Sequence, residues 1–188
     1  MLDISFLPLS DDRVRLRAMT HADAAAYAQG TEDEAVRTFA HLPAPRYTPG
    51  SVIQMIDGVI DEGLTRGDLA VLTIADAATD RFAGSLVLFD VTEDMAEVGF
   101  WLRPEARGAG LAAAALRLAS RWAQFSGLSV LTARTATGNV ASQHVLAKSG
   151  FLPLHRSEGT APSGALIELV HYERTLDDDE TPVSGSRG

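Results

Sequence analysis

The stretch FWLRPEARGAGLAAAAL, residues 100–116, places two glycines between an apolar run and an alanine-rich segment. Gly108 and Gly110 enclose one residue, and helix-forming residues continue from Leu111 without a break. This order predicts a tight backbone turn that leads directly into a helix. Because the first turn of a helix has unpaired N–H groups that bind anions, the stretch predicts a site for a ligand with phosphate groups.

The composition is that of a globular protein. The chain has 188 residues, of which 46% are hydrophobic, and this is enough for one domain with a sizeable core. Cysteine is absent, which excludes disulfides, thiolate nucleophiles and cysteine-based zinc sites. The acidic N-terminal segment does not resemble a signal peptide, so we expect a cytoplasmic protein.

The charge distribution bears on the partners of the chain. The net charge is −9, and residues 177–188 account for three of these negative charges, so the rest of the chain is also acidic. Nucleic-acid binding needs clustered Lys and Arg, and a membrane span needs about 18 apolar residues in a row. We therefore expect neither nucleic acid nor a membrane as a partner, whereas a cationic substrate would be attracted.

Hydrophobic periodicity predicts an α+β (mixed α/β) fold. Alternating or apolar runs indicate strands at residues 14–20, 69–76, 82–91, 95–102, 128–135 and 165–176, and helical spacing indicates helices at 21–30, 31–42, 48–64, 111–125 and 139–150. Several successive strands followed by a strand–helix–strand unit predict a mostly antiparallel sheet with one parallel crossover. We expect one domain at residues 1–176 and an acidic, disordered tail at 177–188.

The glycine loop permits two interpretations. GAGLAA, residues 108–113, matches the G-x-G-x-x-A fingerprint of dinucleotide-binding proteins. In that fingerprint the first glycine follows the strand almost directly, but here five residues separate Leu102 from Gly108. The acidic residue expected at the end of the next strand is missing from LTARTATG, residues 131–138. An NAD(P)-binding oxidoreductase is therefore the less favoured alternative.

The same loop resembles the R/Q-x-x-G-x-G/A signature of the GCN5-related N-acetyltransferases, the GNAT family, through Arg107-Gly108-Ala109-Gly110-Leu111-Ala112. A second stretch, NVASQHVLAKSGF, is similar to the later motif of this family at Asn139, Ser142, Leu146, Lys148, Gly150 and Phe151. The two motifs together resemble the Rim-type ribosomal-protein N-acetyltransferases and their small-molecule relatives over about residues 13–175.

This resemblance implies the GNAT fold, with a central, mostly antiparallel, twisted sheet of six to seven strands and helices on both faces. It also implies acetyl-CoA as co-substrate and no metal. The loop N–H groups and the helix dipole would hold the pyrophosphate, while the pantetheine arm would lie along the strand at 95–102. The resemblance assigns this binding to Phe100, Trp101, Leu102, Arg107, Gly108, Ala109, Gly110, Leu111, Ala112, Asn139, Ser142 and Lys148.

Two residues are candidates for the proton transfers that acetylation of an amine requires. Glu97 lies on the strand before the loop and could accept the proton of the amine, directly or through an ordered water; Asp94 and Glu168 are weaker candidates. Ser142 stands where the Rim-type group has a serine near the CoA sulfur, and its hydroxyl could donate to the leaving thiolate. Leu146 replaces the tyrosine that many family members carry.

The identity of the acceptor amine is the property that the sequence defines least. In this fold it is bound by segments that correspond here to residues 38–50 and 155–164, and Phe39, Arg46 and Tyr47 are candidates to line its pocket. A protein N-terminus and a small-molecule amine are both compatible with the chain, as is a homodimer. A non-catalytic acyl-CoA-binding sensor is the main alternative, and it would tolerate loss of Glu97 and Ser142.

Overall fold

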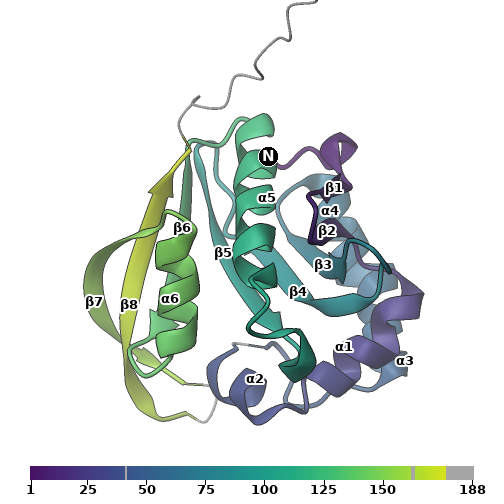
Figure 1. Cartoon of the computed structure of the whole chain (residues 1–188), viewed down its shortest axis with the longest axis horizontal. Coiled ribbons are helices and arrows are strands. Elements are labelled where there is room, and N and C mark those ends of the chain that lie inside the picture. The colour runs from purple at the N-terminus through teal and green to yellow at the C-terminus, as the bar shows by residue number, and fades with distance from the viewer. Residues whose placement is uncertain (41, 162–163, 177–188) are drawn as a thin grey trace, which may run out of the picture.

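The computed structural model describes residues 1–40, 42–161 and 164–176, and the tail expected at 177–188 lies outside them. The described residues form one eight-stranded sheet in the order β1-β2-β3-β4-β5-β6-β8-β7 (Figure 1). Its strands are β1 (Leu9–Ser10), β2 (Val14–Ala18), β3 (Ala70–Asp76), β4 (Phe82–Phe89), β5 (Met95–Leu102), β6 (Val130–Ala136), β7 (Leu152–Thr160) and β8 (Leu166–Thr175).

Neighbouring strands of the described chain are antiparallel except β5 and β6, which are parallel. This arrangement confirms the mostly antiparallel sheet with one crossover, and all six strands expected from periodicity are present. The sheet has eight strands instead of six to seven because β1 and β7 also pair. β7 occupies part of the segment expected to be a loop, residues 155–164. It is an edge strand with largely exposed side chains, so its sequence lacks the apolar alternation that reveals a half-buried strand.

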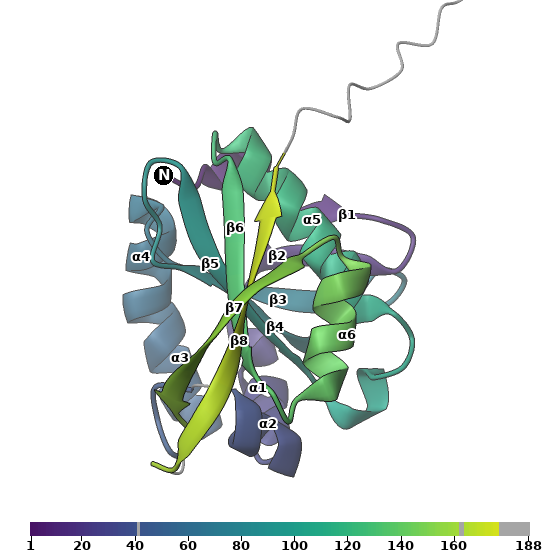
Figure 2. The same cartoon turned by 90° about the vertical axis from the view of Figure 1, so that its left-hand side faces the viewer.

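Helices cover both faces of the sheet, as expected (Figure 2). The α-helices are α1 (Ala24–Gly30), α2 (Glu34–Phe39), α3 (Pro49–Met55), α4 (Asp61–Arg66), α5 (Leu111–Phe125) and α6 (Val140–Lys148). Shorter helical turns are η1 (Ile4–Phe6), η2 (His21–Asp23), η3 (Ile56–Ile60) and η4 (Pro104–Ala106). In Figure 2, α3 and α4 lie on one side of the sheet, and α5 and α6 lie on the other.

Local sequence signals explain where these helices begin. Thr20 and Asp23 form a capping box ahead of α1, and Thr48 caps α3 with Pro49 in the first helical position. The helix expected at 48–64 is interrupted, because Gly58 has φ −118° and ψ −107° within the π-helical turn η3. Glycine tolerates this backbone conformation, so helical spacing alone did not reveal the break.

Two apolar clusters hold the helices to the sheet. The larger packs α5 and Leu146 of α6 against one face, with Trp122 fully buried in it. The smaller packs α1 and α3 against the other face around Tyr27, Phe82 and Trp101. Successive side chains of the central strands therefore alternate between two cores.

Candidate active site

β5 and β6 separate part of the way along their length. The two strands are paired from Met95 to Glu97 of β5, where Glu97 lies beside Thr132 of β6. Beyond Glu97, β5 continues to Leu102 and remains paired with β4, but no further pairing with β6 is present in the described chain. The result is a gap between the two strands whose narrow end is at Glu97.

The alternation of backbone groups identifies which residues of β5 face this gap. The N–H of Arg103 donates to the carbonyl of Ala83 in β4, whereas the carbonyl of Ala96 accepts from the side-chain hydroxyl of Thr132 on β6. Because backbone groups alternate sides along a strand, Phe100 and Leu102 present theirs to the gap. The N–H and carbonyl of Phe100 and the N–H of Leu102 form a short edge that pairs with no other strand of the described chain, while the carbonyl of Leu102 accepts from Arg107.

The glycine loop lies at the wide end of the gap. Gly108 and Gly110 have φ of +80° and +79°, a left-handed conformation that favours glycine, as the sequence predicted for a tight turn. α5 begins immediately after Gly110, and within the described residues no hydrogen-bond acceptor engages the N–H groups of Leu111 and Ala112. These N–H groups and the helix dipole make the loop suited to an anion.

Arg107 connects the glycine loop to α2. Its guanidinium donates from Nε and Nη2 to the carbonyl oxygen of Leu102, at 3.2 and 3.0 Å, and pairs with the carboxylate of Asp33. Asp33 caps the N-terminus of α2, and the hydrogen bond from Arg107 holds the pKa of this carboxyl below its usual value. The side chain of Arg107 therefore fixes the end of β5 and the position of α2.

Asn139 and Ser142, two of the predicted site residues, lie at the start of α6, which is on the same side of the sheet as α5. Asn139 caps this helix, as expected, because its Oδ1 accepts the N–H of Ser142 at 3.2 Å. α5 and α6 each follow one of the two parallel strands, so both run in the same direction and begin at the wide end of the gap (Figure 1). Lys148 lies in the last turn of α6, about 13 Å from its start, so the structure does not bring it beside the glycine loop.

Glu97 is a largely buried carboxylate at the narrow end of the gap. Its side chain is 17% exposed, and its Oε1 lies 2.9 Å from Nε of Arg134 in an ion pair. Burial raises the pKa of Glu97 above its ordinary value, the charge of Arg134 opposes this shift, and the charge of Asp90 adds to it. A carboxylate with a raised pKa is suited to accept a proton near neutral pH. Of the weaker candidates, Glu168 is paired with Arg156.

Trp101 lies on the face of the sheet that carries Glu97. Its ring packs against Tyr27 and Phe82, with ring centroids 5.2 and 5.8 Å apart, and a Cβ on Gly30 would lie 2.5 Å from it. Trp101 therefore belongs to the smaller core and supports β5 from the face of the sheet that carries α1 and α3.

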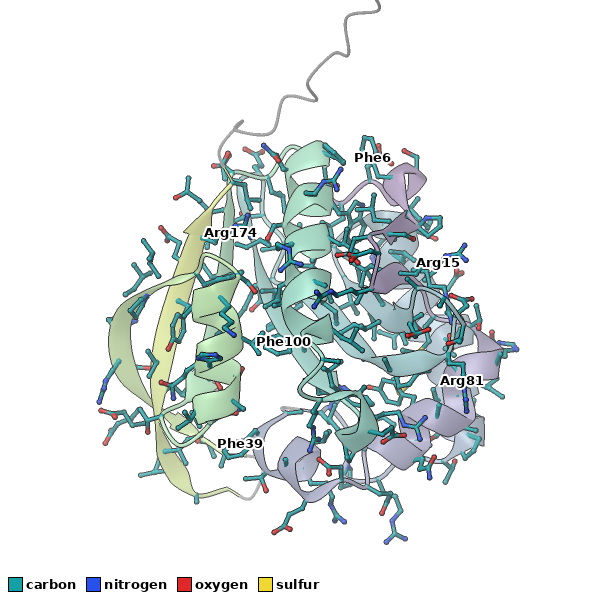
Figure 3. All side chains as sticks on the ribbon, in the orientation of Figure 1. Phe6, Arg15, Phe39, Arg81, Phe100 and Arg174 are labelled. Atoms are coloured by element: carbon teal, nitrogen blue, oxygen red, sulfur yellow. The ribbon has the colours of Figure 1, made fainter. Side chains whose placement is uncertain are left out.

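A cleft of about 560 Å³ lies between α2 and the tip of the β7–β8 hairpin. It is lined by Glu32, Glu34, Arg37, Thr38, Phe39, Ala136, Ala161, Ala165 and Ile167. Figure 3 shows Phe39 between α2 and the start of β8, and Phe100 between α5 and α6. Phe39 thus lines the cleft as expected, but Tyr47 is buried in the smaller core, 5.5 Å from Tyr27.

The cleft and the gap share a wall. Ala136 ends β6 at the cleft, and Asp33 of the α2 cap holds Arg107 at the end of β5. Thr132, Arg134 and Ala136 are every second residue of β6, so their side chains lie on the same face of the strand. This face extends from Ala136 at the cleft to Thr132 beside Glu97. α2 therefore lies across the wide end of the gap.

Sequence reasoning missed three charged residues of this region. Asp33 and Arg134 pair with Arg107 and Glu97, and Nη1 of Arg13 lies 3.4 Å from the carbonyl oxygen of Ala109 in the glycine loop. Each is distant in sequence from its partner, and no local motif marks it. The N-cap position of Asp33 before α2 was the one signal available.

Comparison with known proteins assigns this architecture. Residues 13–152 match the acetyltransferase (GNAT) domain family. The chain belongs to the GNAT family. No curated protein sequence gives a match.

Solved structures show the same GNAT fold. The ribosomal-protein-S5-alanine acetyltransferase from Vibrio fischeri superposes with a TM-score of 0.80 at 17% identity, over 93% of this chain and 100% of that chain. RimJ of Mycobacterium smegmatis, in complex with CoA-disulfide, has a TM-score of 0.77 at 22% identity, over 86% of this chain and 81% of that one. RimL, a ribosomal L7/L12 alpha-N-protein acetyltransferase in complex with coenzyme A, has a TM-score of 0.77 at 18% identity, over 90% and 97% of the two chains.

Two further features concern the setting of this GNAT domain. Among the described residues, no group of three or more His, Cys, Asp or Glu side chains could hold a metal ion. The helices of that part of the chain are all too short or too polar to cross a membrane.

Proposed function

We propose that this GNAT acetyltransferase uses acetyl-CoA to acetylate a primary amine, by direct transfer while both substrates are bound. The observation that carries the proposal is the gap between β5 and β6, with a glycine loop at its wide end and a buried carboxylate at its narrow end. An unpaired strand edge leading away from a helix N-terminus is suited to a ligand that joins a pyrophosphate to an extended amide-containing arm.

The chain's own groups fit acetyl-CoA in this position. Phe100 and Leu102 offer backbone groups to the amides of the pantetheine arm, and a backbone amide of this strand edge would also meet the thioester oxygen. The loop from Gly108 to Ala112 offers N–H groups to the pyrophosphate, whereas the N–H of Arg107 already donates to Pro104. Asn139 and Ser142 offer side-chain groups from α6, whereas Trp101 supports β5 from the smaller core and Lys148 lies at the far end of α6. When bound, acetyl-CoA supplies the activated acetyl group.

Glu97 and Ser142 carry the proton transfers in the proposed reaction. Glu97 accepts the proton that the amine loses as its nitrogen bonds to the acetyl carbon, directly or through a water. Ser142 passes a proton to the sulfur as the carbon–sulfur bond breaks and takes up a proton from solvent water in exchange, so no charge remains on the serine. The loop and α6 keep the reacting groups together, so the protein contributes positioning as well as acid–base chemistry.

We further propose that the cleft beside α2 admits the acceptor. Glu32 and Glu34 place two carboxylates at its lining, beside an apolar surface formed by Phe39 and Ile167. Ala136 is four residues along β6 from Thr132, the neighbour of Glu97, which corresponds to roughly 13 Å. An acceptor that fills the cleft and still reaches Glu97 is therefore extended, such as a peptide N-terminus or an aliphatic amine with a second cationic group.

The proposal also covers the domain organisation, the cellular location and the oligomeric state of the protein. Residues 1–176 constitute one catalytic domain, which acts in the cytoplasm and is compatible with a homodimer. The absence of cysteine supports this location, because reducing compartments do not rely on disulfides.

A coupled binding and thiol-release experiment tests the proposal. The purified protein is titrated calorimetrically with acetyl-CoA, CoA and NAD(P), and is then mixed with acetyl-CoA and a panel of N-terminal peptides, polyamines and amino acids. A thiol-reactive dye reports CoA release without background, because the chain has no cysteine. We expect acetyl-CoA affinity in the micromolar range, about −8 kcal/mol, and release that depends on an amine. Binding without release from any amine would favour an acyl-CoA sensor, and NAD(P) binding alone would overturn the proposal.

A further inference from the structure

A row of polar side chains crosses four adjacent strands from the narrow end of the gap. Glu97 on β5 pairs with Arg134 on β6, and Arg134 lies beside His171 on β8. His171 in turn shares a 2.8 Å hydrogen bond between its Nε2 and Oγ of Ser157, and stacks on His155 with ring centroids 4.3 Å apart. None of these residues except Glu97 belongs to a GNAT motif found in the sequence.

The two side chains of the Glu97–Arg134 ion pair differ in their exposure to solvent. The Glu97 side chain is 17% exposed, whereas that of Arg134 is 46% exposed. A carboxylate as buried as this one needs a compensating partner to remain both charged and fixed in direction. Arg134 supplies this partner as an ion pair, with its Nε 2.9 Å from Oε1 of Glu97, from the strand that borders the gap on the opposite side from β4.

We propose that Arg134 is a positioning residue for Glu97, which it keeps ionised and directed along the face of β6 that leads to the cleft. This inference rests on the proposed function, in which Glu97 is the base. Arg134 does not exchange protons itself, because a guanidinium stays protonated. Its effect on the reaction passes through the orientation and charge of the carboxylate.

The surrounding charges determine whether loss of the Arg134 charge raises or lowers the pKa of Glu97. Arg134 on β6 is the cation beside it, Asp90 follows β4, and His171 and Glu173 of β8 lie beyond Arg134 and Thr132. Burial, His155 and Arg134 together lower the pKa of His171, so His171 is neutral near pH 7 and adds no second positive charge there. Loss of the Arg134 charge therefore leaves burial and Asp90 to raise the pKa of Glu97 further.

Replacement of Arg134 tests the inference through a pH profile. Arg134→Gln removes the charge, and we expect the acidic limb of kcat/KM to move up by about one pH unit, because a charged partner at this distance lowers a carboxyl pKa by at least that amount. The plateau value of kcat should fall roughly tenfold as the carboxylate loses its fixed direction. Arg134→Lys keeps the positive charge but lacks the planar guanidinium. The acidic limb of kcat/KM should therefore lie near its wild-type pH, while kcat should recover only in part.

Arg66→Gln is the matched control. Arg66 likewise forms an ion pair through Nε, with the carboxylate of Asp68 at 2.9 Å, and it lies at the end of α4. This variant should leave the pH profile unchanged. Thermal melting and acetyl-CoA binding of every variant verify that the fold and the donor site are intact.

The outcomes separate this inference from the function on which it rests. An unshifted acidic limb in a folded Arg134→Gln variant overturns the positioning role, as does a raised KM for the acceptor with no change in the limb. If Glu97→Gln itself keeps the wild-type profile, Glu97 is not the base and the inference fails, although acetyl-CoA binding and amine-dependent thiol release would still stand. Lack of acetyl-CoA binding by the wild type would refute the proposed function instead.

Discussion

The two sides of the candidate site are built from different kinds of sequence. The side proposed for the donor consists mainly of two continuous stretches, residues 100–112 and 139–142, each of which follows one of the two parallel strands. The side proposed for the acceptor is assembled from three separate parts of the chain: residues 32–39 at α2, Ala136 at the end of β6, and residues 161–167 at the tip of the β7–β8 hairpin. Two charged pairs, Asp33–Arg107 and Glu97–Arg134, connect one side to the other.

This difference explains how one fold can keep its donor while its acceptor changes. The donor side relies on backbone N–H groups and a strand edge, which depend on glycine and on strand pairing more than on particular side chains. The acceptor side presents side chains of exposed elements, so substitutions there alter recognition at small cost to the fold. Variants of each side should therefore change different measured quantities.

The largest effect is expected at the glycine loop. Gly110→Val places a β-branched residue at φ +79°, with its Cβ 3.1 Å from Arg13, so the turn must change and its N–H groups lose their common direction. We expect calorimetry to show acetyl-CoA affinity at least 100-fold weaker, about 2.7 kcal/mol. Gly127→Val is the control, since Gly127 has φ +87° with open space around it at the other end of α5. Equal losses of affinity in the two variants would mean that strain in the fold, and not the loop, is responsible.

Glu97→Gln should abolish most of the chemistry while acetyl-CoA still binds. The amide cannot accept the amine proton, and we expect kcat to fall by about 100- to 1,000-fold. In the wild type, activity should be lost as the pH falls through the pKa of Glu97, which lies above 4.5 because burial disfavours the charged carboxylate. Glu62→Gln, on α4, serves as control. A kcat within threefold of wild type would assign the base role to a water.

Ser142→Ala should have a smaller effect on the donor side. A thiolate leaves readily, so the loss of its proton donor should reduce kcat only about tenfold at pH 7. The deficit should shrink above about pH 8.5, where a free thiol ionises without help. Ser10→Ala on β1 is the control, and a deficit that does not depend on pH would indicate that Ser142 only positions α6.

The smallest effect is expected at the acceptor cleft. Replacement of Glu32 and Glu34 by Gln removes two exposed charges and should raise KM for a cationic peptide about fivefold, while acetyl-CoA affinity stays the same. The difference should fade at high salt, because exposed charges are screened. An equal change in KM for neutral and cationic acceptors would show that the cleft does not select by charge.

Sequence reasoning predicted the donor side better than the acceptor side for a physical reason. The left-handed glycines, the start of α5 at Leu111 and the Asn139 cap are local properties, and the structure confirms each of them. The splaying of β5 from β6 and the ion pair between Glu97 and Arg134 depend on how distant segments pack, so no short pattern contains them. β7 was missed for a related reason, because an exposed edge strand has no buried face to impose a periodicity.

The central claim, that the donor lies along the unpaired edge of β5, is tested most directly by residue-resolved amide hydrogen exchange with and without acetyl-CoA. We expect acetyl-CoA to slow exchange at Phe100 and Leu102, whose N–H groups face the gap, and at the loop that leads into α5. Gly99 and Trp101, which face β4, should already be protected and should change little. Exchange at Phe100 and Leu102 that is unchanged at saturating acetyl-CoA would contradict the account.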